Sequence, residues 1–189
     1  MGKRKVVVEH TVKSEKIYEG KIIKVRMDTV ELPDQIYAKR EIVEHARGVS
    51  IVAITDVQEI YLVKQYRKAI DKAIYELPAG LVDTGEDVLQ AASRELEEEI
   101  GLKPLNLELV AEAFSSPGFT DEKLSIFFAD EFEVSEKELD PNEYLIFELV
   151  PLTKAIDMVE NFEITDAKTI IGILFAARKY KLWWIKLKY

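Results

Sequence analysis

Alternating hydrophobic and polar residues in the first third of the chain predict short β-strands. The strands expected from this pattern cover residues 5–12, 16–32, 36–45, 49–55 and 59–66. Gly20 interrupts the second of them, which favours a bent strand or a hairpin there. The polar triplet 56–58 separates the last two strands and predicts a second hairpin.

Helical periodicity first appears after residue 85. Leu89, Ala92, Leu96 and Ile100 recur at intervals of three and four, which predicts a helix over 86–100 that ends at Gly101. Further strands are expected at 107–114, 124–129 and 144–150, and helices at 152–161 and 166–181. Strands on both sides of one helix, with two helices at the end, predict an α+β fold arranged as an α/β/α sandwich.

The strand-rich opening is too short to bury a core of its own. We therefore divide the chain into a small N-terminal antiparallel β region, residues 1–45, and a main domain, residues 46–189. The first region is expected to pack on the main domain or on a second subunit, so a homodimer is the expected assembly.

The overall charge limits the possible partners. The 189 residues include 26 Lys and Arg against 35 Asp and Glu, a net charge of −9, which disfavours nucleic acid and anionic membranes as partners. The chain has no cysteine and only two histidines, and no apolar run is long enough to span a membrane. These features predict a soluble cytoplasmic protein, in which an anionic substrate requires a local basic pocket or a bound cation.

The helix expected at 86–100 carries an unusual group of carboxylates near its end. At about 100° per residue, Glu95, Glu98 and Glu99 fall within an arc of about 100°, whereas Glu97 points away. Their mutual repulsion and the negative end of the helix dipole both disfavour this arrangement. Arg94 can pair with Glu98, but one cation cannot neutralise three anions. A divalent cation that prefers oxygen ligands, Mg²⁺ or Mn²⁺, can neutralise them; the alternative is a solvated acidic face.

The spacing of these residues follows a longer pattern. Its defined positions are Gly80, Glu86, Arg94, Glu95, Leu96, Glu98, Glu99, Gly101 and Leu102. The pattern resembles the Nudix box, in which a loop and helix bind divalent cations and hydrolyse nucleoside diphosphates linked to another group. The resemblance implies a Nudix-like fold and metal ligation by Glu95, Glu98 and Glu99 with the carbonyl of Ala79. It also implies that Glu86 and Arg94 form a buried orienting pair and that Gly80 and Gly101 are structural.

Residues outside the box resemble the ADP-ribose pyrophosphatases. The similar segments are 65–67, 76–80, 115–122 and 163–169, and Pro117 lies fifteen residues beyond the end of the box, where that subfamily has a marker proline. This resemblance implies Mg²⁺-dependent hydrolysis of ADP-ribose to AMP and ribose 5-phosphate, with Glu98 among the catalytic residues. The alternatives are hydrolysis of another nucleoside diphosphate derivative (a nucleotide sugar or a dinucleotide) and a non-catalytic, nucleotide-sensing Nudix domain.

The same resemblance suggests substrate contacts, each with a simpler alternative. Arg67 can hold a phosphate through a bidentate fork, or it can form a salt bridge at the end of a strand. Arg40 matches a position that reaches the substrate from the partner subunit, or it forms a surface ion pair. Pro117 and Gly118 form a pocket wall or only a turn, and Glu122 contacts the terminal ribose or is a solvated turn residue.

The general base is expected in the acidic stretch 136–143. By resemblance to the subfamily, a glutamate from a loop after the box activates water, and Glu143 is the first candidate. Glu138 is the second candidate, and a solvated run of charge is the alternative.

Overall fold

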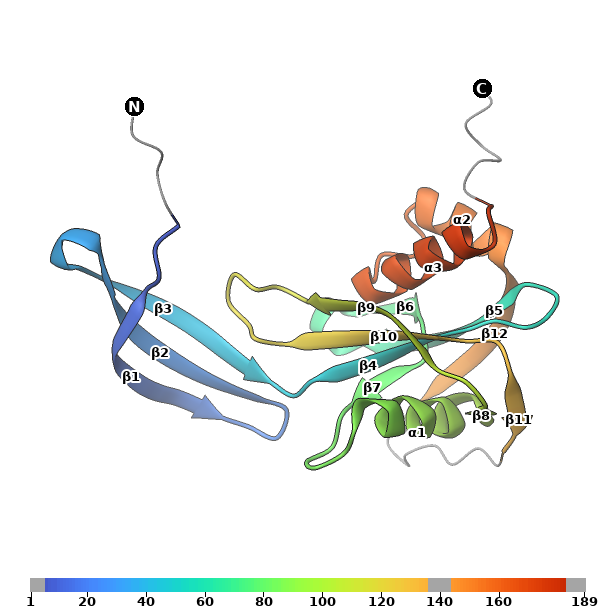
Figure 1. The fold of residues 1–189 in the computed structure, drawn as a ribbon, viewed down its shortest axis with the longest axis horizontal. Coiled ribbons are helices and arrows are strands. Elements are labelled where there is room, and N and C mark those ends of the chain that lie inside the picture. Colours follow the sequence, from blue (N-terminus) through green and yellow to red (C-terminus); the bar gives the residue numbers. More distant parts are fainter. Residues whose placement is uncertain (1–5, 136–143, 183–189) are drawn as a thin grey trace, which may run out of the picture. The chain divides into compact units, whose positions relative to one another are not determined.

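The computed structural model describes residues 6–135 and 144–182 (Figure 1). Contacts divide the chain into two compact units. The first contains the residues up to Ala46 together with Phe114–Lys123, and the second contains Arg47–Ala113 and the residues from Leu124 onward.

The first unit is built on a three-stranded antiparallel sheet in the order β1-β2-β3. Its strands are β1 (His10–Glu19), β2 (Ile23–Leu32) and β3 (Ile36–His45), and the 3₁₀ helix η1 (Pro33–Gln35) joins the last two. The turn after β1 includes Gly20, whose N–H bonds the carbonyl of Ile23 at 2.9 Å, so a hairpin is present there. The prediction of a separate strand at 5–12 is wrong. The first strand, β1, begins only at His10, where its pairing with β2 starts.

The second unit contains three sheets and the three α-helices of the described residues. The sheet orders are β7-β4-β10-β9, β12-β5-β6 and β11-β8. The strands are β4 (Gly48–Ala53), β5 (Glu59–Arg67), β6 (Lys72–Glu76), β7 (Ala79–Leu81), β8 (Leu102–Pro104), β9 (Glu108–Phe114), β10 (Lys123–Ala129), β11 (Phe132–Val134) and β12 (Leu145–Pro151), and the helices are η2 (Lys68–Ile70), α1 (Val88–Ile100), α2 (Leu152–Glu160) and α3 (Ala167–Lys179). The predicted α+β class with an N-terminal antiparallel sheet is confirmed.

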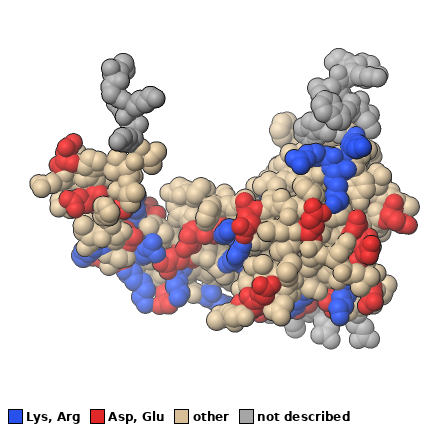
Figure 2. All heavy atoms as spheres, viewed as in Figure 1, with Lys and Arg blue, Asp and Glu red and all other residues tan. Residues whose placement is uncertain are grey.

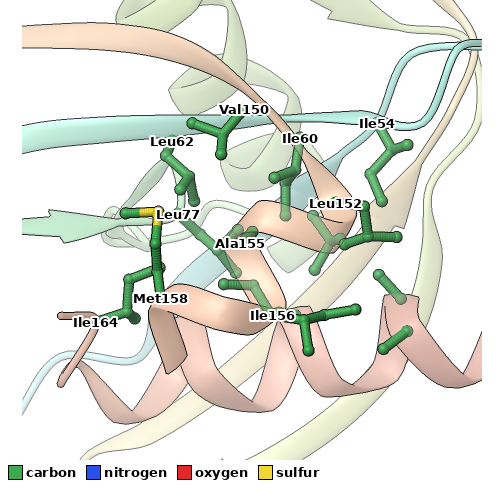
Figure 3. Close-up of a cluster of buried hydrophobic side chains, with 14 of the residues drawn as sticks. Ile54, Ile60, Leu62, Leu77, Val150, Leu152, Ala155, Ile156, Met158 and Ile164 are labelled. Atoms are coloured by element: carbon green, nitrogen blue, oxygen red, sulfur yellow. The ribbon is translucent and has the colours of Figure 1, made fainter. Parts of the chain in front are cut away.

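Alternation along the buried strands creates two cores. On β4, Ile51 and Ala53 belong to the apolar cluster that includes residues of α1, whereas Val52, with Ile54 just after the strand, belongs to the cluster that includes α2 and α3. Successive strand residues point to opposite faces, so β4 supplies both cores. Figure 1 shows α1 on one side of the sheets and α2 and α3 on the other, and Figure 3 shows the second cluster between α2 and the strands. The α/β/α sandwich is therefore present within the second unit.

The hairpin expected between 49–55 and 59–66 is wrong in its pairing. Among the described residues, one isolated antiparallel bridge joins Ile54, the residue after β4, to Ile60 of β5, and the two strands belong to different sheets. Every residue of β4 is buried, and this strand pairs with β10 in parallel and with β7. The short strands β6, β7, β8 and β11 were not predicted.

Helix α1 begins two residues later than expected. Asp87 caps it by accepting the N–H of Leu89 at 2.8 Å, and Gln90 accepts the N–H of Asp87, which completes a capping box. Gly101 ends the helix in the left-handed conformation, with φ 72°. Leu89 belongs to the apolar repeat that predicts this helix, and such a repeat is typical of a buried face, but Leu89 is 47% exposed. The buried residues of α1 are Ala91, Ala92, Glu95, Leu96, Glu99 and Ile100.

The surface carries both signs of charge. On the face shown in Figure 2, acidic and basic side chains are interspersed. No helix within the described ranges is long and apolar enough to cross a membrane.

Candidate active site

Strand β7 and helix α1 lie against each other at the centre of the predicted site. The Glu95 side chain lies directly over the backbone of Gly80, since a Cβ added to Gly80 would come within 2.0 Å of the Glu95 carboxyl carbon. Glu95 is only 9% exposed. Gly80 is therefore required for this close approach, in which a carboxylate lies on the strand that leads into the box.

The other two carboxylates differ in their burial. Glu99 is 1% exposed, and its Oε2 accepts the N–H of Ala79 at 3.1 Å. The Glu98 side chain is 38% exposed. Two of the three acidic groups thus lie inside the buried face of α1, and only Glu98 reaches solvent substantially.

Arg94 holds this acidic face together through all of its guanidinium nitrogens. Nε and Nη2 each donate to the Glu86 carboxylate at 3.0 Å, Nη1 donates to Glu95 at 2.8 Å and to Glu98 at 3.1 Å, and Nη2 also donates to the carbonyl of Leu81 at 3.0 Å. Hydrogen bonding to Glu86 is the largest of the interactions that raise the pKa of Arg94 above its ordinary value. The same bond, helped by the N–H of Asp83, lowers the pKa of Glu86.

A hollow of about 640 Å³ lies against one face of α1. It is lined by Glu86, Gln90, Ser93, Arg94, Glu97, Glu98 and Ser135. Glu97 accepts hydrogen bonds from Ser93 at 3.1 Å and from Ser135 at 3.3 Å, whereas Glu95 and Glu98 accept hydrogen bonds from Arg94.

The donor chemistry of this face suits a divalent cation. Three carboxylates and a backbone carbonyl are oxygen ligands, which Mg²⁺ and Mn²⁺ prefer, and two of the carboxylates are held against β7. In the part of the chain that the structure describes, no group of three or more acidic or histidine side chains is already arranged around one metal position. Glu95 and Glu98 instead share the Nη1 atom of Arg94.

Arg67 lies at the end of β5 and is paired with Glu76 at the end of β6. Its Nε and Nη2 donate to the two Glu76 oxygens at 2.6 and 2.7 Å, and Lys168 of α3 donates to the same carboxylate at 2.6 Å. Burial raises the pKa of Glu76, but the bonds from Arg67 and Lys168 outweigh it, so this pKa lies below 4.5. The salt bridge considered for Arg67 is therefore present, while its side chain remains 43% exposed.

Four of the predicted substrate-binding residues belong to the first unit, whereas the residues of the Nudix-like box belong to the second. Arg40, on β3, donates to Glu9 from Nε at 2.9 Å and from Nη2 at 2.6 Å, which is a surface ion pair. Pro117 and Gly118 lie in an exposed turn, and the Glu122 carboxylate lies 3.5 Å from Nδ1 of His45.

The candidates for the general base cannot be located in the structure, and two residues that contact the site region have no predicted role. Glu138 and Glu143 lie outside the described residues. The sequence predicts no individual role for Lys168 or Thr169 within the segment 163–169, but in the structure they bond Glu76 and Leu77, respectively. An aspartate three residues before Thr169 is a helix-start signal that could have directed attention to them.

The sequence matches two families that together cover most of the chain. These are the NUDIX domain over residues 44–171 and the nucleoside diphosphate sugar hydrolase N-terminal domain over residues 9–43. The chain therefore belongs to the Nudix hydrolases, as its motif predicted, and the family implies a nucleoside diphosphate derivative as substrate.

Individual relatives are similar along nearly the whole length. An ADP-ribose pyrophosphatase of Bacillus subtilis (strain 168) is 40% identical over 180 residues, which is 94% of this chain and 97% of that protein. A methanol dehydrogenase activator of Bacillus methanolicus is 38% identical over 90% of this chain and 94% of its own. A crystal structure of an ADP compounds hydrolase shares the fold, with a TM-score of 0.83 and 22% identity over 96% of this chain and 98% of that one.

Proposed function

We propose that the protein hydrolyses ADP-ribose to AMP and ribose 5-phosphate with Mg²⁺ as its cofactor. The observation that carries this proposal is the acidic face of α1, where Glu95 and Glu99 are buried against β7 beside the more exposed Glu98. The relatives named ADP-ribose pyrophosphatase in Bacillus subtilis and Mycobacterium tuberculosis, which are 40% and 35% identical, support the choice of substrate.

In this proposal Glu95, Glu98 and Glu99, with the carbonyl of Ala79, hold the cation; Mn²⁺ is the second candidate. When bound, a divalent cation neutralises charge on the diphosphate and lowers the pKa of bound water. Arg94 keeps two of the three carboxylates in place, and it is itself held by Glu86. Gly101 allows α1 to end immediately after these residues.

The substrate anion requires positive charge that the whole chain, at −9, does not supply. We assign this role to Arg67, whose side chain is 43% exposed although one edge is held by Glu76. Arg40, Pro117, Gly118 and Glu122 remain proposed substrate contacts on the basis of the resemblance.

We also propose that residues 1–45 form a separate dimerisation domain and residues 46–189 the hydrolase domain. Every residue of β1 is exposed, and Val12, Ile17 and Tyr18 on this strand are more than half exposed, which leaves apolar surface for a second copy. Light scattering at micromolar concentration should give twice the mass of the chain; a monomer would contradict this assembly.

The function is tested by incubating the protein with ADP-ribose and Mg²⁺ and separating the products by chromatography. AMP and ribose 5-phosphate are expected. A nucleotide sugar and a dinucleotide belong in the same panel, because the N-terminal match is to a domain of nucleoside diphosphate sugar hydrolases. Faster hydrolysis of either would change the substrate, and tight binding of ADP-ribose without any hydrolysis would indicate a sensing domain.

Gly80→Ala should impair activity more than stability. The new methyl group must displace the Glu95 carboxylate, which is the end of a flexible side chain, so we expect a loss of about 1 kcal/mol in unfolding free energy. Because the displaced group is a proposed cation ligand, turnover should fall by about 10–10². In a Glu95→Ala background the same substitution should cause no further loss, and an additional drop there would contradict this explanation.

Glu143→Gln tests the proposed general base, which rests on the sequence alone. We expect turnover to fall while the Mg²⁺ concentration for half-maximal activity stays unchanged, since a base that is not a ligand affects proton transfer only. Glu138→Gln is the matched variant in the same acidic stretch. Full activity in Glu143→Gln with a loss in Glu138→Gln would transfer the role to Glu138.

A further inference from the structure

A buried ionic cluster lies at the end of β6, three residues before the box strand β7. Its centre is the Glu76 carboxylate, which is 1% exposed and accepts hydrogen bonds from Arg67 and Lys168. Lys168 lies 3.0 Å from the Asp166 carboxylate as well. Two cations and two carboxylates thus alternate from β5 to α3, with a net charge of zero.

The same cluster fixes the backbone beside it. Asp166 caps α3 by accepting the N–H of Thr169 at 3.0 Å and its hydroxyl at 2.6 Å. The Thr169 hydroxyl oxygen in turn accepts the buried N–H of Leu77 at 2.8 Å. The first residues of α3 therefore hold Glu76 and Leu77, and with them the chain that leads into β7.

The members of the cluster differ in their access to solvent. The Arg67 side chain is 43% exposed, whereas Lys168 is 13% and Asp166 is 18% exposed. Lys168 is thus largely buried and bonded to Glu76, and its charge is less screened than that of a surface lysine. The hydrogen bonds to Glu76 raise the pKa of Arg67, burial opposes them, and the negative charges of Glu76, Glu99 and Asp166 add to the increase.

We propose that Lys168 is a positioning residue for the substrate diphosphate. Lys168 shares the Glu76 carboxylate with Arg67 and offsets part of its negative charge, so Glu76 holds the Arg67 guanidinium in place with less loss of its positive field. Arg67 is the group that contacts the diphosphate, and Lys168 acts through Glu76. This inference rests on the proposed function, because it assigns Arg67 to the diphosphate of ADP-ribose.

Two substitutions in the cluster should act in opposite directions. Lys168→Met leaves a net charge of −1 beside the diphosphate, and we expect KM for ADP-ribose to rise about fivefold to tenfold with kcat within about twofold of its original value. Asp166→Asn keeps a helix-capping side chain but leaves a net charge of +1, so KM should fall. Lys168→Arg keeps the charge and should restore the original KM.

The measurement combines steady-state kinetics with Mg²⁺ and calorimetric dissociation constants for ADP-ribose and inorganic pyrophosphate without metal. Lys179→Met is the matched control, because Lys179 is on the same helix and its Nζ lies 2.7 Å from Glu108; its KM should not change. A purely structural cluster predicts that Lys168→Met and Asp166→Asn both weaken binding, and this result would overturn the proposal. An unchanged KM in folded Lys168→Met would do the same.

The two proposals can fail separately. If the protein binds ADP-ribose without hydrolysing it, the proposed function fails, and the dissociation constants of the variants still decide the role of Lys168. If it binds neither ADP-ribose nor pyrophosphate, the role of Lys168 is overturned as well. Should Lys168→Met not fold, Asp166→Asn and Lys168→Arg decide, and weaker binding by Asp166→Asn contradicts the inference.

Discussion

Glu98→Gln should lower the turnover of ADP-ribose by at least about 10², because it removes one unit of negative charge from the proposed cation site. The fold should persist. The Glu98 side chain is 38% exposed, and a glutamine oxygen can still accept the Arg94 hydrogen bond that Glu98 receives at 3.1 Å. Kinetics over a range of Mg²⁺ concentrations, together with a thermal melt, separate the loss of function from the loss of structure.

Glu97→Gln is the matched control for this substitution. Glu97 is adjacent in sequence and on the same helix, but its carboxylate bonds Ser93 and Ser135 and not Arg94. We expect near-normal turnover for Glu97→Gln. Equal losses in the two variants would mean that the total charge of α1 matters and not the particular face, and near-normal turnover in Glu98→Gln would defeat the metal assignment.

The acidic face could be predicted because its members are close in sequence. One helix and the loop before it contain nearly all of them, so helical periodicity alone brought Glu95, Glu98 and Glu99 to one side. The same periodicity places them at the edge of the apolar stripe, but it does not predict that Glu95 and Glu99 are buried. Leu89 belongs to the apolar repeat that predicts the helix, and hydrophobicity favours its burial, yet it is 47% exposed while Glu95 and Glu99 are buried. Gly80 makes room for the Glu95 carboxylate, which Arg94 also bonds, and the N–H of Ala79 bonds the Glu99 carboxylate.

Contacts between segments that are far apart in the sequence could not be predicted, for a different reason. Lys168 and Glu76 are 92 residues apart, and no local pattern encodes their ion pair. The pairing of β4 and β5 failed similarly, because the short polar turn between them favoured a hairpin. In the structure, β4 pairs in parallel with β10, and that partner comes from far along the chain. Strand existence was thus predictable from alternation, whereas sheet membership depended on tertiary packing.

Arg94→Met should cause the largest loss of stability among the variants considered. The substitution keeps much of the side-chain volume but leaves three carboxylates, Glu86, Glu95 and Glu98, without the cation they share. Removing one partner from a buried ionic group typically costs several kcal/mol; because the side chains of Glu86 and Glu95 are only 16% and 11% exposed, we expect a loss of about 3 kcal/mol in unfolding free energy. Chemical denaturation at neutral pH measures it. Arg178→Met, at an exposed position on α3, is the control and should change stability by less than about 0.5 kcal/mol.

The pH dependence of that loss identifies its cause. The Arg94 hydrogen bond, followed by the Asp83 N–H, lowers the pKa of Glu86 below its ordinary value of 4.5. A group whose pKa is lower in the folded state than in the unfolded state stabilises the fold at pH values above its unfolded-state pKa. This stabilisation is lost as the pH falls through its folded-state pKa. The difference in unfolding free energy between the original protein and Arg94→Met should therefore be constant from neutral pH to about 5 and shrink at lower pH. A difference that stays constant in acid would show that lost packing, and not lost charge pairing, destabilises the variant.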